Sequence, residues 1–262
     1  MNSLDMNLFS LAGQDVWIFG GAGYLGSHVV ELLHAAGASV LCVDLEKRAE
    51  QLVAQKNWSD RVTPASLNVS DDELERFLQQ QLAERGTPSG LVIMTYKSTG
   101  KALGELTAAE FDEANHVGLT STFLIARDVG SKMAIKEQGS IVLFSSMYGT
   151  IAPDPAAYTS PMNPNPVEYG VGKAGIQQLS RYLSVYFGAS GVRCNSISPG
   201  PFPFPAMQTS HPNFIAKLSA KTPLGRIGSA SEMSGPVAFL LSDASTYITG
   251  HNLAVDGGWT AW

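Results

Sequence analysis

The chain has 262 residues, a net charge of −6 and a pI of about 5.3. Its lysines and arginines are scattered rather than gathered into runs, so the charge pattern typical of nucleic-acid binding is missing and we expect no nucleic-acid partner. The apolar runs are too short to span a bilayer, and Met1–Leu11 carries Asp5 but no basic residue, unlike a signal peptide; we therefore expect no membrane partner and a cytoplasmic location.

Two cysteines, Cys42 and Cys194, stand in separate strand-like segments. No Cys-x-x-Cys and no histidine spacing typical of metal ligands accompanies them, so we interpret both as core thiols and expect no metal. Charged residues make up 15% of the chain, below the ~25% of an ordinary soluble domain. A compact protein with a large interior is one explanation of this low fraction; we favour the other, helical surface buried against other subunits.

Apolar strand-like runs alternate with longer helical patterns from end to end, which predicts parallel βαβ units in one domain spanning residues 1–262. In chain order we expect a strand at 16–19, a helix at 24–36, a strand at 39–43, a helix at 46–55, a strand at 61–67, a helix at 70–85, a strand at 91–94, a long helix at 107–137, a strand at 140–144, a helix at 168–188, a strand at 193–197, two short helices and a last strand at 252–255.

Two of the helix starts have the spacing of a capping box, at Ser70–Glu73 and at Thr107–Glu110. One stretch, residues 151–167, is irregular because it is rich in proline, which forbids a helix there.

A glycine-rich turn follows the first strand and opens the first helix, which is the context of a dinucleotide-binding turn. Glycines let the backbone approach a pyrophosphate, and the helix start supplies free N–H groups. The alternative is an ordinary glycine-rich turn. The predicted cofactor contacts here are Gly20, Gly23, Tyr24, Leu25 and Gly26.

Asp44 ends the second strand, where a carboxylate can accept hydrogen bonds from ribose hydroxyls and repel a 2′-phosphate, so NAD is favoured over NADP. As an alternative, Asp44 caps the following helix. Lys47 and Arg48 also lie close enough to tolerate a phosphate.

Tyr169 and Lys173 are four residues apart on a predicted helix and so share one face. A free tyrosine ionises near pH ~10, so it serves poorly as an acid or base at neutral pH unless a cation stabilises the phenolate. Lys173 is placed to be that cation.

Together, the glycine turn, Asn115, Ser146, Tyr169-x-x-x-Lys173, Asn195–Gly200 and Val255–Gly258 resemble the short-chain dehydrogenase/reductase family, from Leu8 to Gly258. The resemblance implies a Rossmann-type doubly wound parallel sheet and an NAD(P)-dependent enzyme that interconverts a secondary alcohol and a ketone.

The resemblance also implies a catalytic tetrad. Tyr169 would exchange a proton with the substrate oxygen, Ser146 would hold that oxygen, and Lys173 would lower the pKa of Tyr169 and bind the nicotinamide ribose. Asn115 would position a water that relays protons to Lys173. The pattern Ser-x-x-Gly selects Ser146 over Ser145. Further cofactor contacts are implied at Asn68, Val69, Thr95, Pro199, Gly200 and Phe202.

The chain departs from the family along one wall of the expected cofactor site. The pattern Asn-Asn-Ala-Gly after the fourth strand falls on Ile93–Tyr96 without a match, so Tyr96 is expected to crowd or shift that wall. Phe19 replaces the threonine that begins the glycine turn, and the threonine after Gly200 is lost in Phe202–Phe204. These changes put cofactor affinity in doubt but leave the tetrad intact.

From Ser146 to Tyr169 is 169 − 146 = 23 positions, longer than this family normally uses. We interpret the extra residues, 151–167, as a proline-rich loop that shapes the substrate pocket. A neutral surface insertion or an oligomer contact is the alternative. A weak likeness to oxidoreductases of surface-sugar pathways favours a sugar or sugar-acid substrate.

Three functions therefore compete: the dehydrogenase, a nucleotide-binding scaffold that has lost catalysis, and a nucleotide-sugar epimerase or dehydratase, which the spacing of Gly20, Gly23 and Gly26 resembles. The family commonly assembles through the helices that begin near Ala109 and Glu168, which implies a homotetramer.

Overall fold

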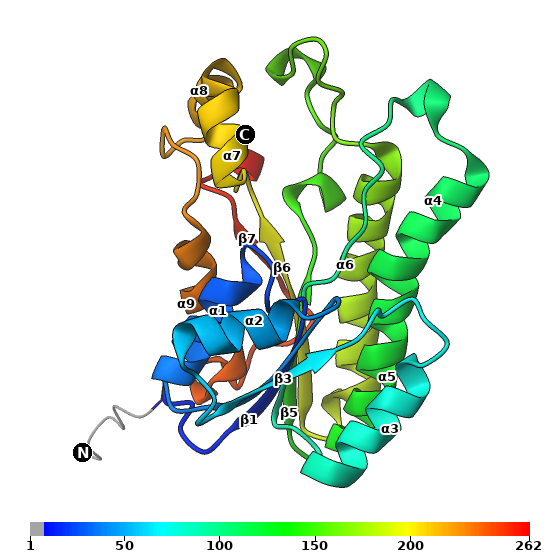
Figure 1. Cartoon of the computed structure of the whole chain (residues 1–262), viewed down its shortest axis with the longest axis vertical. Coiled ribbons are helices and arrows are strands. Elements are labelled where there is room, and N and C mark those ends of the chain that lie inside the picture. The colour runs from blue at the N-terminus through cyan, green and yellow to red at the C-terminus, as the bar shows by residue number, and fades with distance from the viewer. Residues whose placement is uncertain (1–7) are drawn as a thin grey trace.

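A computed structural model describes residues 8–262, which build one seven-stranded parallel sheet with helices on both faces (Figure 1). The strand order is β3-β2-β1-β4-β5-β6-β7, so the Rossmann-type α/β fold expected from the sequence is confirmed. The strands are β1 Asp15–Phe19, β2 Ser39–Asp44, β3 Val62–Ser66, β4 Gly90–Ile93, β5 Gly139–Phe144, β6 Val192–Pro199 and β7 Asn252–Val255. We expect that the segment Met1–Leu11 is not a signal peptide. Part of this segment lies outside the described residues.

Two hydrophobic cores, one on each face of the sheet, hold the helices. Helices α1, α2 and α9 contribute to one core, and α3, α5 and α6 to the other. The helices are α1 Gly26–Ala35, α2 Arg48–Lys56, α3 Leu74–Arg85, α4 Ala108–Asn115, α5 Ser121–Ile135, α6 Val167–Gly188, α7 Pro205–Ser210, α8 Pro212–Lys221 and α9 Ser234–Leu241.

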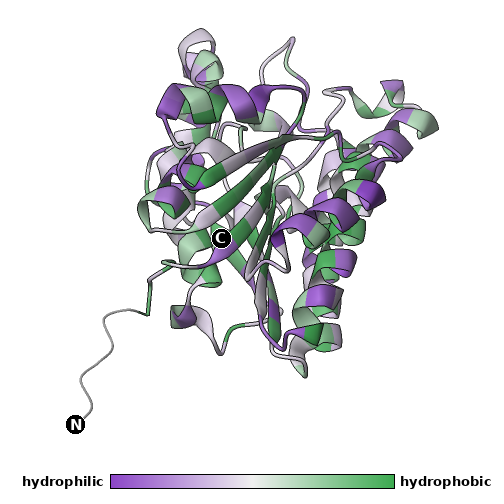
Figure 2. Ribbon diagram, turned by 60° about the horizontal axis from the view of Figure 1, so that its bottom comes forward, coloured by the Kyte–Doolittle hydropathy of each residue, from purple (hydrophilic) through white to green (hydrophobic). Residues whose placement is uncertain are grey.

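The central strands are buried on both sides, which explains their continuous apolar sequences. All four residues Val16–Phe19 of β1 are fully buried, and Figure 2 shows the sheet as a hydrophobic layer between helices whose outer faces are hydrophilic. Cys42 and Cys194 are buried free thiols in β2 and β6, as expected.

The order of the strands reverses between β1 and β4, because the chain runs outward from β1 to β3 and then returns to β4. In open parallel sheets this reversal leaves a crevice at the carboxyl ends of the strands, where ligands bind. The glycine turn, the segment from Met94 and the residues from Ser145 all begin at this edge, after β1, β4 and β5 respectively.

Two expectations about the helices need correction. The capping box at Ser70–Glu73 does not form: α3 begins at Leu74 without a side-chain cap, and the Oγ of Ser70 donates instead to Oδ1 of Asn68 at 2.9 Å. Short polar side chains often compete with helix caps in this way. The box at Thr107–Glu110 is confirmed.

The long helix expected at 107–137 is interrupted. A π-helical turn at His116–Thr120 separates α4 from α5, directly after Asn115. Such bulges are frequent at functional sites. Within residues 8–262, no helix is long and apolar enough to cross a membrane, and no three metal-ligating side chains gather.

Candidate active site

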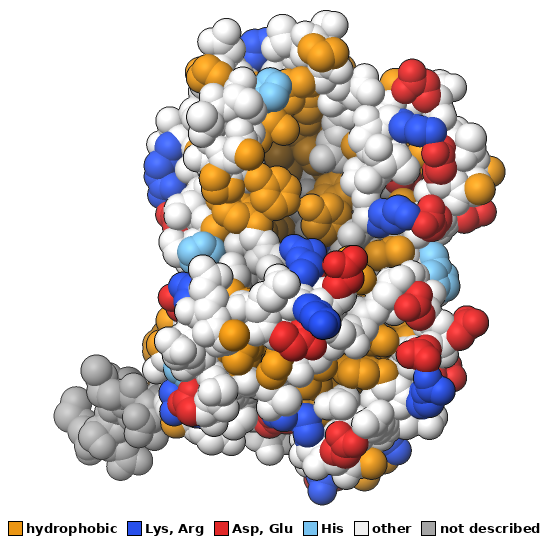
Figure 3. Space-filling model, in the orientation of Figure 1, with side chains coloured by type: hydrophobic (Ala, Val, Ile, Leu, Met, Phe, Trp, Pro, Cys, Tyr) orange, Lys and Arg blue, Asp and Glu red, His pale blue; other side chains and the backbone are white. Residues whose placement is uncertain are grey.

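A cavity of about 580 Å³ lies at the carboxyl edge of the sheet. Figure 3 shows an opening with hydrophobic walls in the upper half of the molecule, on the side that carries α7 and α8 in Figure 1. Of the residues predicted to bind the cofactor or act in catalysis, all except Asn115 line this cavity. Lining residues that the sequence did not single out include Leu45, Leu67, Lys97, Ser98 and Val117. Leu45 and Leu67 directly follow β2 and β3, Lys97 and Ser98 lie in the segment after β4, and Val117 is two residues after Asn115. These positions were the available signal.

The glycine turn is shaped for close approach. Gly20 has a φ of +84°, which favours glycine, and a Cβ on Gly26 would lie 2.2 Å from the carbonyl oxygen of Gly20. Helix α1 starts at Gly26 without a side-chain cap. Its first N–H groups and its dipole therefore face the cavity edge, and the turn fits a dinucleotide pyrophosphate.

Asp44 fixes this turn. Its buried carboxylate accepts hydrogen bonds from the backbone N–H of Ala22 and that of Leu45, each at 2.8 Å. Arg48 lies 3.3 Å away and is half-exposed. The alternative that Asp44 caps the next helix is not supported, because α2 has Lys47 at its N-cap and no side-chain cap.

Tyr169 and Lys173 lie in the first two turns of α6. The Nζ of Lys173 is buried, donates to the carbonyl oxygen of Phe144 at 2.7 Å, and lies 5.6 Å from the ring centroid of Tyr169. Burial lowers the pKa of Lys173 to about 7. Burial also raises the pKa of Tyr169 to about 12, opposed by a hydrogen bond with Ser146. The net direction for Tyr169 is thus upward, not the lowering by Lys173 that the sequence led us to expect.

Ser146 and Ser145 take different roles in the structure. Ser145 is used structurally, since its Oγ donates to the carbonyl oxygen of Lys173 at 2.7 Å and accepts from Gln177 at 3.1 Å. Both serines line the cavity, and the Oγ of Ser146 accepts from the N–H of Tyr148 at 3.1 Å. A Cβ on Gly149 would lie 2.7 Å from the backbone of Lys173, which explains why the turn after Ser146 requires glycine.

Asn115 stands behind the cavity rather than in its lining. Its Nδ2 donates to the carbonyl oxygen of Phe111 at 3.0 Å, and its Oδ1 is buried without a partner in the described chain. Gly172 allows this approach, because a Cβ there would lie 2.9 Å from the Oδ1. A buried acceptor without a partner, next to the residue that precedes Lys173, fits the predicted water relay.

Aromatic side chains narrow the cavity at two places. The ring of Tyr96 meets the ring of Tyr169 edge to face, with centroids 5.8 Å apart. The ring of Phe204 lies against that of Tyr24 in the glycine turn, with centroids 5.1 Å apart.

The hydroxyl of Thr95 is buried without a partner within residues 8–262, and it is free to bind a polar group in the cavity.

The proline-rich segment 151–167 docks on α8. The hydroxyls of Tyr148 and Tyr158 are 2.8 Å apart, and the Tyr158 ring lies 5.3 Å from that of Phe214. Asp154 also forms an ion pair with Lys221. Residues 151–166 contain no α-helix, as expected, only the 3-10 turn Pro155–Ala157; helix α6 begins at the last residue of the segment, Val167. Its role in substrate binding stays a prediction.

Known proteins resemble the chain along nearly its whole length. A family model described as enoyl-(acyl carrier protein) reductase matches residues 21–260. An NADP-dependent mannitol dehydrogenase of Hypocrea jecorina is 30% identical, over 97% of this chain and 95% of that protein. A galactitol 2-dehydrogenase of Rhizobium johnstonii is 30% identical, over 97% and 98%. The crystal structure of a short-chain dehydrogenase from Leptospira borgpetersenii with bound NAD⁺ is 32% identical, with a TM-score of 0.87 over 99% of this chain and 98% of that one.

Proposed function

Because the chain belongs to the short-chain dehydrogenase/reductase family and is an oxidoreductase of CH–OH groups, we propose that its substrate is a polar secondary alcohol of the sugar-alcohol or sugar-acid class, or the corresponding ketone. The observation that supports chemistry between an alcohol and a ketone is the convergence of Ser146, Tyr169 and Lys173 in one cavity with the glycine turn.

A nicotinamide dinucleotide supplies hydride transfer when it is bound. The glycine turn, Asp44 and Thr95 would hold it, and Lys173 would bind its ribose. Tyr169 gives a proton to the substrate oxygen during reduction and takes it back during oxidation. The hydroxyl of Ser146 holds that oxygen within reach of the phenol.

The sugar-like substrate class is supported by the names of the relatives and by the polar groups near Tyr169. The mannitol and galactitol enzymes act on polyols by name. The paired hydroxyls of Tyr148 and Tyr158 join the proline-rich segment to the turn after Ser146. Hydroxyl groups in this position suit a substrate that carries several hydroxyls of its own.

We propose NAD rather than NADP as the cofactor. The Asp44 carboxylate is held by two backbone N–H groups and lines the cavity beside the glycine turn, where it would repel a 2′-phosphate. Arg48 is the one lining cation near it among the described residues. Equilibrium titration should give a lower Kd for NAD than for NADP, and Asp44→Ala should reduce or reverse that preference. A native preference for NADP would refute the assignment.

We also propose that the chain works as one catalytic domain in a cytoplasmic homotetramer. Helix α6 exposes Val171, Tyr182, Val185 and Tyr186, and α5 exposes Phe123, which gives the two helices apolar surface for a partner subunit. Sedimentation equilibrium should give four times the chain mass of 27.8 kDa. A mass near one subunit would refute the tetramer, and recovery in a membrane or extracellular fraction would refute the location.

The deciding experiment is turnover of a panel of sugar alcohols, sugar acids and keto-sugars with NAD or NADH. Wild type should produce reduced cofactor and ketone in equal amounts, and Tyr169→Phe should lose at least a hundredfold in kcat. Tyr247→Phe is the matched control, because the Tyr247 side chain is fully exposed and lies outside both the cavity and the proposed subunit interface.

Equal turnover by wild type and Tyr169→Phe would favour the hypothesis of a nucleotide-binding scaffold. Turnover without net release of reduced cofactor would favour the epimerase reading.

A further inference from the structure

Lys173 carries a buried ammonium group without a carboxylate beside it. Its side chain is 5% exposed, and within residues 8–262 it takes part in no ion pair. One of its three N–H groups donates a hydrogen bond to the carbonyl oxygen of Phe144, with Nζ and oxygen 2.7 Å apart. A buried cation with one neutral acceptor requires further stabilisation.

Two tyrosine rings lie around this ammonium. Its Nζ is 5.7 Å from the ring centroid of Tyr96 and 5.6 Å from that of Tyr169, and the two rings meet edge to face. An ammonium within about 6 Å of a ring face is attracted by the ring quadrupole, more strongly where water is excluded. The tyrosine at position 96 therefore supplies a ring where the family pattern has a glycine.

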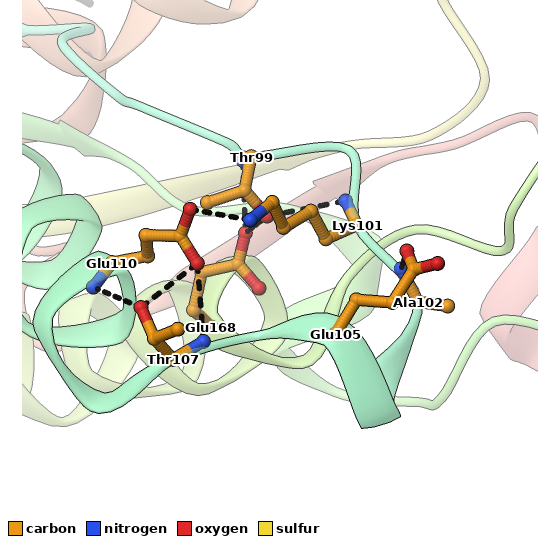
Figure 4. A network of polar contacts seen from close by, with 7 residues as sticks. All are labelled: Thr99, Lys101, Ala102, Glu105, Thr107, Glu110 and Glu168. Atoms are coloured by element: carbon orange, nitrogen blue, oxygen red, sulfur yellow. Dashed lines mark hydrogen bonds and ion pairs between the residues drawn. The ribbon is translucent and has the colours of Figure 1, made fainter.

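The position of the Tyr96 segment is fixed by a distant residue. Glu168, 1% exposed and next to Tyr169 in α6, accepts hydrogen bonds from the backbone N–H of Thr99 at 3.0 Å and from its hydroxyl at 2.8 Å. Figure 4 shows this carboxylate reaching across to Thr99, while Lys101 bonds to Glu110 instead. The segment after β4 is thus anchored to the helix that carries the catalytic tyrosine.

We propose that Tyr96 is a positioning residue whose ring holds the charged side chain of Lys173 in place, and that the contact between Glu168 and Thr99 keeps the ring there. The ring takes the place of the carboxylate that commonly compensates the charge of a buried lysine. The inference concerns the charge of Lys173 and needs no particular substrate.

The groups around Lys173 make its charge state sensitive to this ring. The segment after β4 contributes Tyr96, α6 contributes Tyr169, and β5 contributes the carbonyl of Phe144 with the serines that follow it. Burial alone lowers the pKa of Lys173 to about 7. Any loss of the ring should lower it further, because the ring attracts only the protonated form.

The test is a pH titration of Lys173 in the protein without substrate, read from the ¹³Cε signal of labelled lysine and assigned with Lys173→Arg. Tyr96→Leu keeps the site apolar but removes the ring, and it should lower the midpoint by about one pH unit. Tyr96→Phe keeps the ring and should leave the midpoint within ~0.3 unit of wild type. Equal midpoints in wild type and Tyr96→Leu would overturn the proposal.

Thr99→Val separates the ring from its anchor. It removes the hydroxyl that bonds to Glu168 but leaves Tyr96 in the chain, so a midpoint between those of wild type and Tyr96→Leu supports the anchoring role. A midpoint equal to that of wild type overturns that role. Because the titration requires no turnover, failure here is distinguishable from failure of the proposed reaction, which the substrate panel tests separately.

Discussion

The contact between Thr99 and Glu168 should stabilise the fold, and Thr99→Val measures by how much. Both hydrogen bonds that Glu168 receives end on its Oε1 and come from Thr99, while its Oε2 is buried without a partner in the described chain. Valine has nearly the shape of threonine but removes the hydroxyl. One of the two bonds to a buried carboxylate is then lost.

The size of the loss follows from the kind of bond. A hydrogen bond to a charged group contributes about 1.5–3 kcal/mol, because the carboxylate left behind is poorly solvated. The Thr99 hydroxyl also accepts from the N–H of Lys101 at 3.2 Å, so a second, weaker bond is lost with it. We expect Thr99→Val to lower the free energy of unfolding by about 2 kcal/mol and the Tm by about 4–8 °C.

Urea unfolding at pH 7, followed by circular dichroism, is the assay. Thr209→Val is the matched control, because the Thr209 hydroxyl bonds at 3.2 Å to the carbonyl oxygen of Pro205 on the exposed surface of α7. The control should lose less than ~0.5 kcal/mol. Equal losses in the two variants would refute the view that the Glu168 contact is a specific anchor.

Three further outcomes follow from the site. Gly26→Ala should abolish the thermal shift that NAD produces while the chain still folds, because the new Cβ would lie 2.2 Å from the oxygen of Gly20. Tyr158→Phe should raise KM severalfold with kcat retained and cost about 1 kcal/mol of stability, because the hydroxyl of Tyr148 loses its partner; unchanged values in steady-state kinetics and urea unfolding would contradict this. Folding raises the pKa of Tyr169 from about 10 to about 12, so its contribution to stability is complete below pH 10 and is lost as the pH rises through 12. Between pH 8 and 11, wild type should therefore lose about 1 kcal/mol more of its free energy of unfolding than Tyr169→Phe, as measured by urea unfolding.

Local spacing was sufficient to predict the sheet and most of the cavity. The glycine turn follows β1, Asp44 ends β2, and Tyr169 and Lys173 share one helix face, so position along the chain fixes position in space. The capping box at Ser70 failed for an equally local reason, since Asn68 offered the serine hydroxyl a different acceptor.

The surroundings of Lys173 could not be predicted in the same way. The sequence shows a tyrosine at position 96, where the family pattern has glycine, but not the direction of its ring. The anchor joins Thr99 to Glu168 across 69 positions, and no pattern of spacing links the two. The π-helical turn after Asn115 likewise interrupts a stretch whose sequence pattern is that of one continuous helix.

Two of the departures from the family pattern are aromatic side chains that contact residues of the expected site. Tyr96 closes on Tyr169 at one end of the cavity, and Phe204 closes on Tyr24 beside the glycine turn. Excluding water strengthens every charge interaction inside, which favours a proton-transferring pair but also makes an unbalanced ammonium costly. The ring of Tyr96, itself half-exposed, attracts the ammonium and so offsets part of that cost. In the sequence, Tyr96 is the departure that puts cofactor binding most in doubt. In the structure it is the residue best placed to support Lys173.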